Sequence, residues 1–156
     1  MPRLFLGRHG EASYDAPSDR SRPLSEQGIK SSKIVVEKHT KRLSDIQTIW
    51  CSDLLRAQQT ARIYAATLNK SVQVKSFLRP DSSPERVIRK IEAAFDADVS
   101  DLLIVGHQPL LGELQSLLCE GNCYSSHPFI TSEITLLQLE LVGVGLASFD
   151  SQFLPV

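Results

Sequence analysis

The sequence has no long hydrophobic run. Its apolar stretches, such as residues 102–105, are short, whereas a helix that crosses a bilayer needs about 20 apolar residues. The apolar run at residues 4–6 is also too short for the core of a secretory signal peptide. We therefore expect no membrane association, and we expect a cytoplasmic protein.

The sequence contains few cysteines, and their number is odd. The 156 residues contain three cysteines, Cys51, Cys119 and Cys123, and a chain of this length can build a core without disulfide support. We therefore expect reduced thiols in a reducing compartment. Cys119, Cys123 and His127 lie near one another in the chain but have no evident fourth ligand, so we expect no metal site.

Neither sign of charge is in excess. The chain has 17 Lys and Arg residues against 18 Asp and Glu residues, a net charge of −1, which argues against a nucleic acid partner. Glycine and proline form no segment long enough to be a linker, and no repeat of about 20 to 50 residues recurs. The hydrophobic fraction of 42% is that of an ordinary globular protein. We expect one domain that spans residues 1–156.

Strand-like and helix-like patterns alternate along the chain. The predicted strands cover residues 4–6, 46–50, 72–74 and 101–105, and the predicted helices cover residues 25–43 and 54–68, a segment that begins at Ser83 and Pro84, and residues 109–118. After Gly121, two further strands at 134–141 and 146–149 predict a hairpin. This order predicts an α/β fold of three layers, αβα, with a mostly parallel central sheet and helices on both faces.

Cationic and protonatable side chains follow three of the predicted strands. Arg8 and His9 follow the first strand, Arg56 follows the second and His107 follows the fourth. Because the carboxyl ends of parallel strands meet at one edge of a sheet, we expect a pocket there for a compact dianion such as a phosphoryl group. A histidine between arginines stays neutral and is then available to attack phosphorus. The other histidine donates a hydrogen bond to a phosphoryl oxygen.

The tripeptide Arg8-His9-Gly10 resembles the signature of the histidine phosphatase superfamily, which is also called the phosphoglycerate mutase-like superfamily. Residues 22–25 with Gly28, residues 52–57 with 59–61, and Gly106-His107 with Pro109 follow in the order and spacing of that family. The short chain and the direct run from Gly10 to residues 22–24 resemble its compact, SixA-type branch of phosphohistidine phosphatases.

The resemblance implies a covalent mechanism. His9 takes the phosphoryl group, Arg8, Arg56 and His107 bind its oxygens, and water then cleaves the phosphohistidine intermediate. It also implies that no metal or cofactor is needed, and that the substrate is a phosphohistidine-containing protein such as a phosphotransfer domain or a phosphocarrier. We expect a monomer.

Four points stay open at this stage. A general acid for the leaving group is not placed, and Glu11 and Asp81 are the nearest candidates. Arg22 either lines the mouth of the pocket or holds its loop by pairing with Asp19. The alternative functions are a small-molecule phosphomonoesterase of the same superfamily and a non-catalytic, phosphate-dependent binding module. The redox sensitivity of Cys51, which adjoins the predicted pocket, is also undecided.

Overall fold

A six-stranded sheet organises the computed structural model, which describes residues 2–156. The strands are β1 (Arg3–Arg8), β2 (Thr48–Cys51), β3 (Val72–Val74), β4 (Asp101–Gly106), β5 (Ile134–Leu139) and β6 (Ala147–Phe153). Their order is β3-β2-β4-β1-β5-β6. β3, β2, β4 and β1 pair in parallel, whereas β5 runs antiparallel to both β1 and β6.

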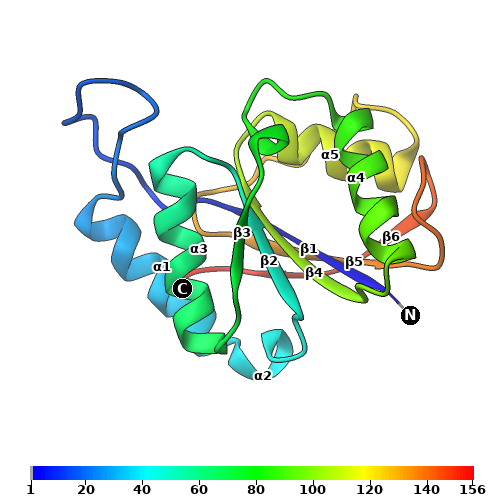
Figure 1. The fold of residues 1–156 in the computed structure, drawn as a ribbon, viewed down its shortest axis with the longest axis horizontal. Coiled ribbons are helices and arrows are strands. Elements are labelled where there is room, and N and C mark those ends of the chain that lie inside the picture. The colour runs from blue at the N-terminus through cyan, green and yellow to red at the C-terminus, as the bar shows by residue number, and fades with distance from the viewer. Residues whose placement is uncertain (1) are drawn as a thin grey trace.

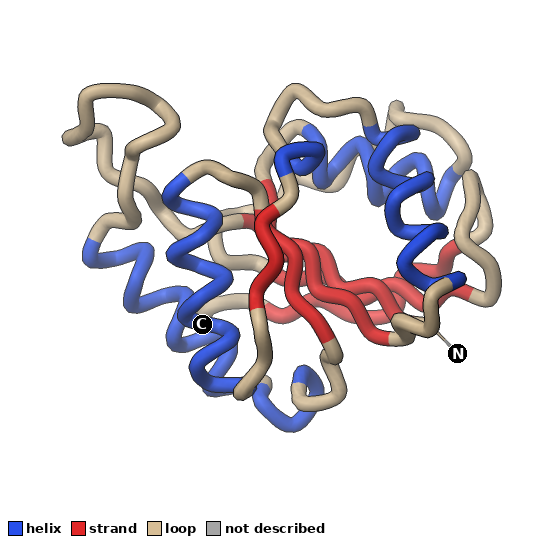
Figure 2. Tube along the Cα trace, viewed as in Figure 1, coloured by secondary structure: helices blue, strands red, loops and turns tan. Residues whose placement is uncertain are grey.

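Helices cover both faces of this sheet, so the predicted three-layer αβα architecture is confirmed (Figures 1 and 2). One layer contains α1 (Glu26–Lys38), α2 (Thr40–Leu43) and α3 (Leu55–Leu68), and the other contains the short 3-10 helix η1 (Ser76–Leu78), α4 (Pro84–Asp96) and α5 (Leu110–Glu120). Within the described residues 2–156, no helix is both long and apolar enough to cross a membrane.

The central strand β4 connects the two cores. Leu102 and Ile104 belong to the cluster beneath α4 and α5, whereas Leu103 and Val105 belong to the cluster beneath α1 and α3. All four side chains are fully buried. This explains why the run at 101–105 lacks apolar–polar alternation, as expected of a strand that is covered on both faces.

Two predicted helix starts are confirmed. The Ser25 side chain accepts a hydrogen bond from the Gly28 N–H at the start of α1. Ser83 accepts one from the Arg86 N–H at the start of α4, whose first residue is Pro84. A short polar side chain at this position satisfies a backbone donor that the helix itself leaves free.

The prediction of one continuous helix over residues 25–43 is wrong. The chain leaves helical geometry at His39, whose φ is −114°, and α2 follows as a separate helical turn. Val36 and Leu43 of this segment are buried, whereas Ile29, which has the same helical spacing, is 39% exposed. The late strands also differ from prediction, since β5 ends at Leu139 and β6 continues to Phe153.

Candidate active site

A cavity of about 620 Å³ lies where the parallel strands β1, β2 and β4 end. The predicted site residues Arg8, His9, Arg22, Arg56 and His107 all line it. Its wall is completed by Glu11, Ala12, Ser13, Tyr14, Ser25, Pro80, Gln108 and Thr131. The structure therefore gathers at one sheet edge side chains that are about 100 positions apart in the sequence.

His9 follows the last residue of β1 and is held through its backbone and its ring. Its N–H donates to the Gly106 carbonyl of β4 at 3.0 Å, and its Nδ1 lies 2.6 Å from the Gly10 carbonyl. Because a carbonyl only accepts, Nδ1 carries the ring proton and Nε2 keeps its lone pair. Burial, followed by the charges of Arg56, Arg8 and Arg22, lowers the pKa of His9 to about 4. At neutral pH the ring is an uncharged base whose Nε2 makes no hydrogen bond within residues 2–156.

Gly10 lets this segment approach α1 closely. A Cβ on Gly10 would lie 2.8 Å from the Gly28 carbonyl oxygen, and a Cβ on Gly28 would collide with the backbone of Glu11. The Gly10 N–H donates to the Thr60 hydroxyl of α3 at 3.0 Å. The close backbone packing at Gly10 and Gly28 thus fixes the position of the segment that carries His9.

Two arginines approach His9 from different elements. Arg8 donates from Nη1 to the Phe129 carbonyl at 2.7 Å, and burial lowers the pKa of Arg8. Arg56 occupies the second position of α3, a helix whose N-cap residue Leu54 offers no side-chain acceptor. The Arg56 side chain is 7% exposed. A buried cation at the N-terminal end of a helix, where the helix dipole is positive, creates an environment that suits an anion.

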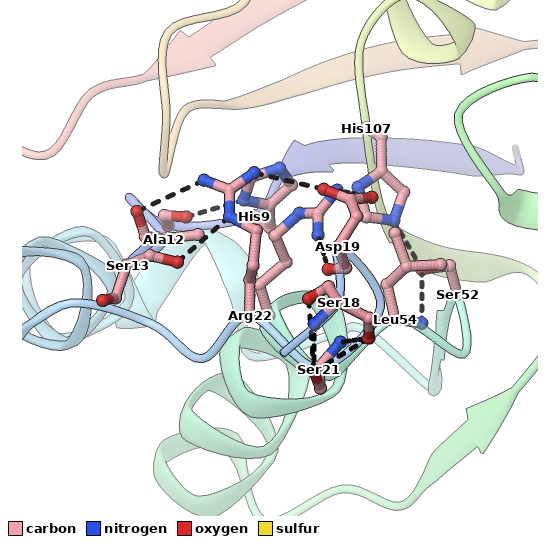
Figure 3. Close-up of polar contacts among 12 residues, drawn as sticks. His9, Ala12, Ser13, Ser18, Asp19, Ser21, Arg22, Ser52, Leu54 and His107 are labelled. Carbon is pink, nitrogen blue, oxygen red and sulfur yellow. Dashed lines mark hydrogen bonds and ion pairs between the residues drawn. The ribbon is translucent and has the colours of Figure 1, made fainter. Parts of the chain in front are cut away.

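Arg22 performs both of the roles left open by the sequence. It lines the cavity, and it also pairs with Asp19 through Nη1 at 3.2 Å while its Nε donates to the Ser13 carbonyl at 3.0 Å (Figure 3). Asp19 also pairs with Arg56 at 3.3 Å. Partial burial opposes ionisation of Asp19, but the hydrogen bond from Arg22 and the charge of Arg56 lower its pKa overall. Asp19 therefore connects the two arginines at the rim.

His107 follows β4 and lies beside His9, with 5.0 Å between the ring centroids. Its Nε2 is 2.5 Å from the Ser52 hydroxyl oxygen (Figure 3). Burial, followed by the proximity of His9 and Arg56, lowers the pKa of His107 to about 3. The site thus holds two neutral imidazoles among three guanidinium groups, and the positive charge that remains for a ligand comes from the arginines.

Two buried polar atoms in this site have no hydrogen-bond partner among the described residues. Arg8 Nε and His107 Nδ1 are both shielded from solvent and make no hydrogen bond within residues 2–156. Buried polar groups are nearly always paired in folded proteins. An oxyanion such as a phosphoryl group offers several acceptors and no apolar surface, so it would satisfy the Arg8 donor, and His107 as well when Nδ1 carries the ring proton.

Some contributors to the site were missed by sequence reasoning. The loop after α5 supplies the Phe129 carbonyl to Arg8, and Glu133 in the same loop is 2% exposed and pairs with His127 at 2.6 Å. A backbone acceptor has no signal in a sequence, and this loop lacks the periodicity that located the other elements. Glu133 had one weak signal, a carboxylate immediately before an apolar strand.

The structure also shows where Glu11, Asp81 and Cys51 lie, whose roles the sequence left undecided. Glu11 is exposed on the cavity wall, where Ser25 donates to its carboxylate at 3.2 Å, whereas Asp81 is exposed and does not line the cavity. Cys51 is fully buried, and burial raises the pKa of its thiol to about 11. A protonated, inaccessible thiol is a poor nucleophile and reacts slowly with oxidants.

Comparison with known proteins defines the class of this fold and site. Residues 4–80 match the family model of the histidine phosphatase superfamily, branch 1. Together with the full-length relatives below, this match shows that the chain belongs to the histidine phosphatase superfamily, a family of phosphatases with the phosphoglycerate mutase-like α/β fold.

The particular relatives are proteins of SixA type. The chain is 32% identical over 155 residues to phosphohistidine phosphatase SixA of Escherichia coli (strain K12), which covers 98% of this chain and 94% of the relative. It is 30% identical over 141 residues to the phosphohistidine phosphatase SixA homolog of Haemophilus influenzae, covering 84% and 86% of the two chains. A solved structure of the protein histidine phosphatase SixA complexed with tungstate matches with a TM-score of 0.89 and 31% identity, covering 98% and 97%.

Proposed function

We propose that this protein is a phosphohistidine phosphatase, which hydrolyses phosphoryl groups from histidine side chains of a protein through a covalent intermediate on His9. The main support is the His9 ring: Nδ1 is occupied by the Gly10 carbonyl at 2.6 Å, and Nε2 is free beside Arg8 and Arg56. The similarity to SixA over almost the whole chain supports the same substrate class.

The first step transfers the phosphoryl group between two imidazoles. Nε2 of His9 attacks phosphorus while the bond between phosphorus and the substrate nitrogen breaks. If the substrate imidazole already carries a proton on its other nitrogen, it leaves as a neutral ring. This leaving group needs no general acid, which agrees with a site whose carboxylates are an exposed Glu11 and an Asp19 already paired with Arg22 and Arg56.

The second step returns His9 to its starting form. Water attacks phosphorus, the bond to Nε2 breaks, and both protons of the water leave on dihydrogen phosphate. The proton on Nδ1 stays hydrogen-bonded to the Gly10 carbonyl throughout, so it stabilises the positive charge of the phosphorylated ring. Arg8, Arg56 and His107 bind the phosphoryl oxygens in both steps.

The test is phosphate release from a panel that contains a histidine-phosphorylated carrier protein, p-nitrophenyl phosphate and several sugar phosphates. We expect fast release from the carrier and loss of activity by several orders of magnitude in His9→Ala, because the other neutral imidazole of the site, His107, has its Nε2 against the Ser52 hydroxyl. His39→Ala is the matched control, since His39 lies against Phe153 and does not line the cavity.

Three outcomes contradict parts of this proposal. Preference for the small esters would make the protein a phosphomonoesterase and would turn attention to Glu11 as its acid. Wild-type rates in His9→Ala would refute the covalent mechanism. Tight tungstate binding without release from any substrate would indicate a binding module.

A further inference from the structure

Ser52 lies directly behind His107 and outside the cavity. It follows β2, its side chain is fully buried, and its N–H donates to the Val105 carbonyl of β4 at 3.3 Å. Its hydroxyl oxygen has two neighbours among the described residues: His107 Nε2 at 2.5 Å and the Leu54 N–H, which donates to it at 3.3 Å. Ser52 therefore contacts the second histidine of the site but does not line the cavity itself.

The hydrogen bonds around this hydroxyl determine where the proton of His107 resides. The Leu54 N–H already donates to the oxygen, so the hydroxyl proton needs an acceptor, and His107 Nε2 is the acceptor within reach. If Nε2 instead carried the ring proton, the buried hydroxyl proton would have no acceptor. Nδ1 of His107 would then be a buried lone pair without a donor. Burying two unsatisfied groups is costly, so the first arrangement is favoured.

We propose that Ser52 is a positioning residue that donates its hydroxyl proton to His107 Nε2 and so holds the proton of the neutral ring on Nδ1, as the donor for a phosphoryl oxygen. The role in phosphoryl binding rests on the proposed function, whereas the assignment of the tautomer does not. It accounts for the buried Nδ1 that has no partner within residues 2–156.

The tautomer matters because His107 is uncharged at neutral pH. A neutral imidazole has a single N–H, and the wrong tautomer would present a lone pair to oxygens that are themselves negatively charged. His107 therefore contributes to binding through a directed N–H, and the arginines contribute the charge. Without Ser52 both tautomers become accessible, and a fraction of the enzyme loses this donor.

The direct test is nuclear magnetic resonance of protein labelled with ¹⁵N in the histidine rings. The ring nitrogen shifts and their couplings to ring protons distinguish the two tautomers, and the His107 signals are identified by their absence in His107→Asn. We expect the Nδ1–H tautomer in the wild-type protein without ligand. A wild-type spectrum that shows Nε2–H on His107 overturns the proposal before any Ser52 variant is made.

Variants then test the part played by the hydroxyl. Ser52→Ala should populate the Nε2–H tautomer, and Ser52→Thr, which keeps the hydroxyl, should restore Nδ1–H. Ser116→Ala is the matched control, because Ser116 is also buried but bonds to the Asn122 carbonyl, outside the cavity. An unchanged His107 tautomer in Ser52→Ala overturns the proposal, and this holds even if the other variants fold poorly.

Kinetics provide the second measurement. We expect kcat to fall on the order of tenfold in Ser52→Ala for both p-nitrophenyl phosphate and the phosphorylated carrier, which corresponds to the loss of one directed hydrogen bond. We expect Ser52→Thr to recover most of this loss and Ser116→Ala to show none. A wild-type protein that releases no phosphate from any substrate would refute the proposed function, whereas the spectra would still decide the role of Ser52.

Discussion

At the scale of single residues, the protonation state of His9 decides whether the site can act. Burial and the neighbouring charges of Arg56 and Arg8 lower its pKa to about 4, against an ordinary value of about 6.5. An ordinary histidine is largely protonated at pH 5, whereas His9 stays mostly neutral there. Its Nε2 should therefore remain available for attack in mildly acidic solution.

The resulting prediction is a pH profile. Above about pH 5, we expect titration of His9 to have no effect on kcat/KM. As the pH drops through about 4, kcat/KM should fall, because protonation removes the Nε2 lone pair. Titration of the His9 ring proton signals in the free enzyme gives the same midpoint without relying on substrate ionisation. A midpoint near 6.5 would show that the arginines and burial do not act on His9 in this way.

The same pKa has a consequence for stability. Since the folded pKa of His9 lies below the unfolded value, the unfolded chain binds more protons between about pH 6.5 and 4. The free energy of unfolding should be fully retained above pH 6.5 and decrease as the pH falls through this window. His9→Gln removes the titrating ring and should reduce the decrease, which urea titration at several pH values would show.

At the scale of elements, the contact between the segment after β1 and helix α1 sets the position of His9. Gly28 faces the backbone of Glu11, and a Cβ on Gly28 would lie 2.9 Å from the Glu11 nitrogen and nearer still to its carbonyl oxygen. Backbone atoms cannot move aside as a flexible side chain can. The helix or the segment that carries His9 must shift if this space is filled.

We therefore predict that Gly28→Ala is destabilising in spite of the higher helix propensity of alanine. The expected loss is roughly 3 kcal/mol, in the range of overpacking in a rigid environment, together with a drop in kcat because His9 is displaced. The control is Gly7→Ala in β1, where the added Cβ would meet side chains of Ile134 and Leu103 at ordinary contact distances. Equal stability losses in both variants would show that the Gly28 contact is not special.

The elements also show how far the sequence could predict the fold. β4 was predictable as a short uninterrupted apolar run, and α5 was predictable because its apolar residues recur at helical spacing. The break at His39 was not, because Val36 and Leu43 keep the helical spacing across it. β6 was predicted too short because Ser151 and Gln152 extend it through pairing with Leu136 and Thr135 of β5, and polar side chains such as these show no apolar alternation.

The same distinction applies to the site. Arg8, His9, Arg56 and His107 were predicted because each stands near the end of a predicted strand, and the topology brings those ends together. The contacts that orient these side chains were not predictable. The Phe129 carbonyl contacts Arg8, and the Ser52 hydroxyl contacts His107, only because the fold brings these groups within hydrogen-bond distance.

At the scale of the whole molecule, the site and the core are separate parts of one structure. The reacting groups lie at the carboxyl ends of the strands, whereas the middle of β4 joins the two apolar cores. Ile104 is fully buried there and packs in the layer formed with α4 and α5. A change at Ile104 should therefore affect stability without touching the geometry around His9.

We predict that Ile104→Ala lowers the free energy of unfolding by about 2 to 5 kcal/mol, through lost burial and the cavity left behind, while kcat measured well below the melting temperature stays within about twofold of the wild type. Ile29→Ala is the matched control, because the same atoms are removed from a side chain that is 39% exposed. Its expected loss is below about 1 kcal/mol. Urea unfolding and phosphate release, measured on the same preparations, separate the two effects. A large fall in kcat in folded Ile104→Ala would mean that the middle of the sheet transmits strain to the strand ends, and that the positions of His9 and His107 depend on packing across the whole sheet.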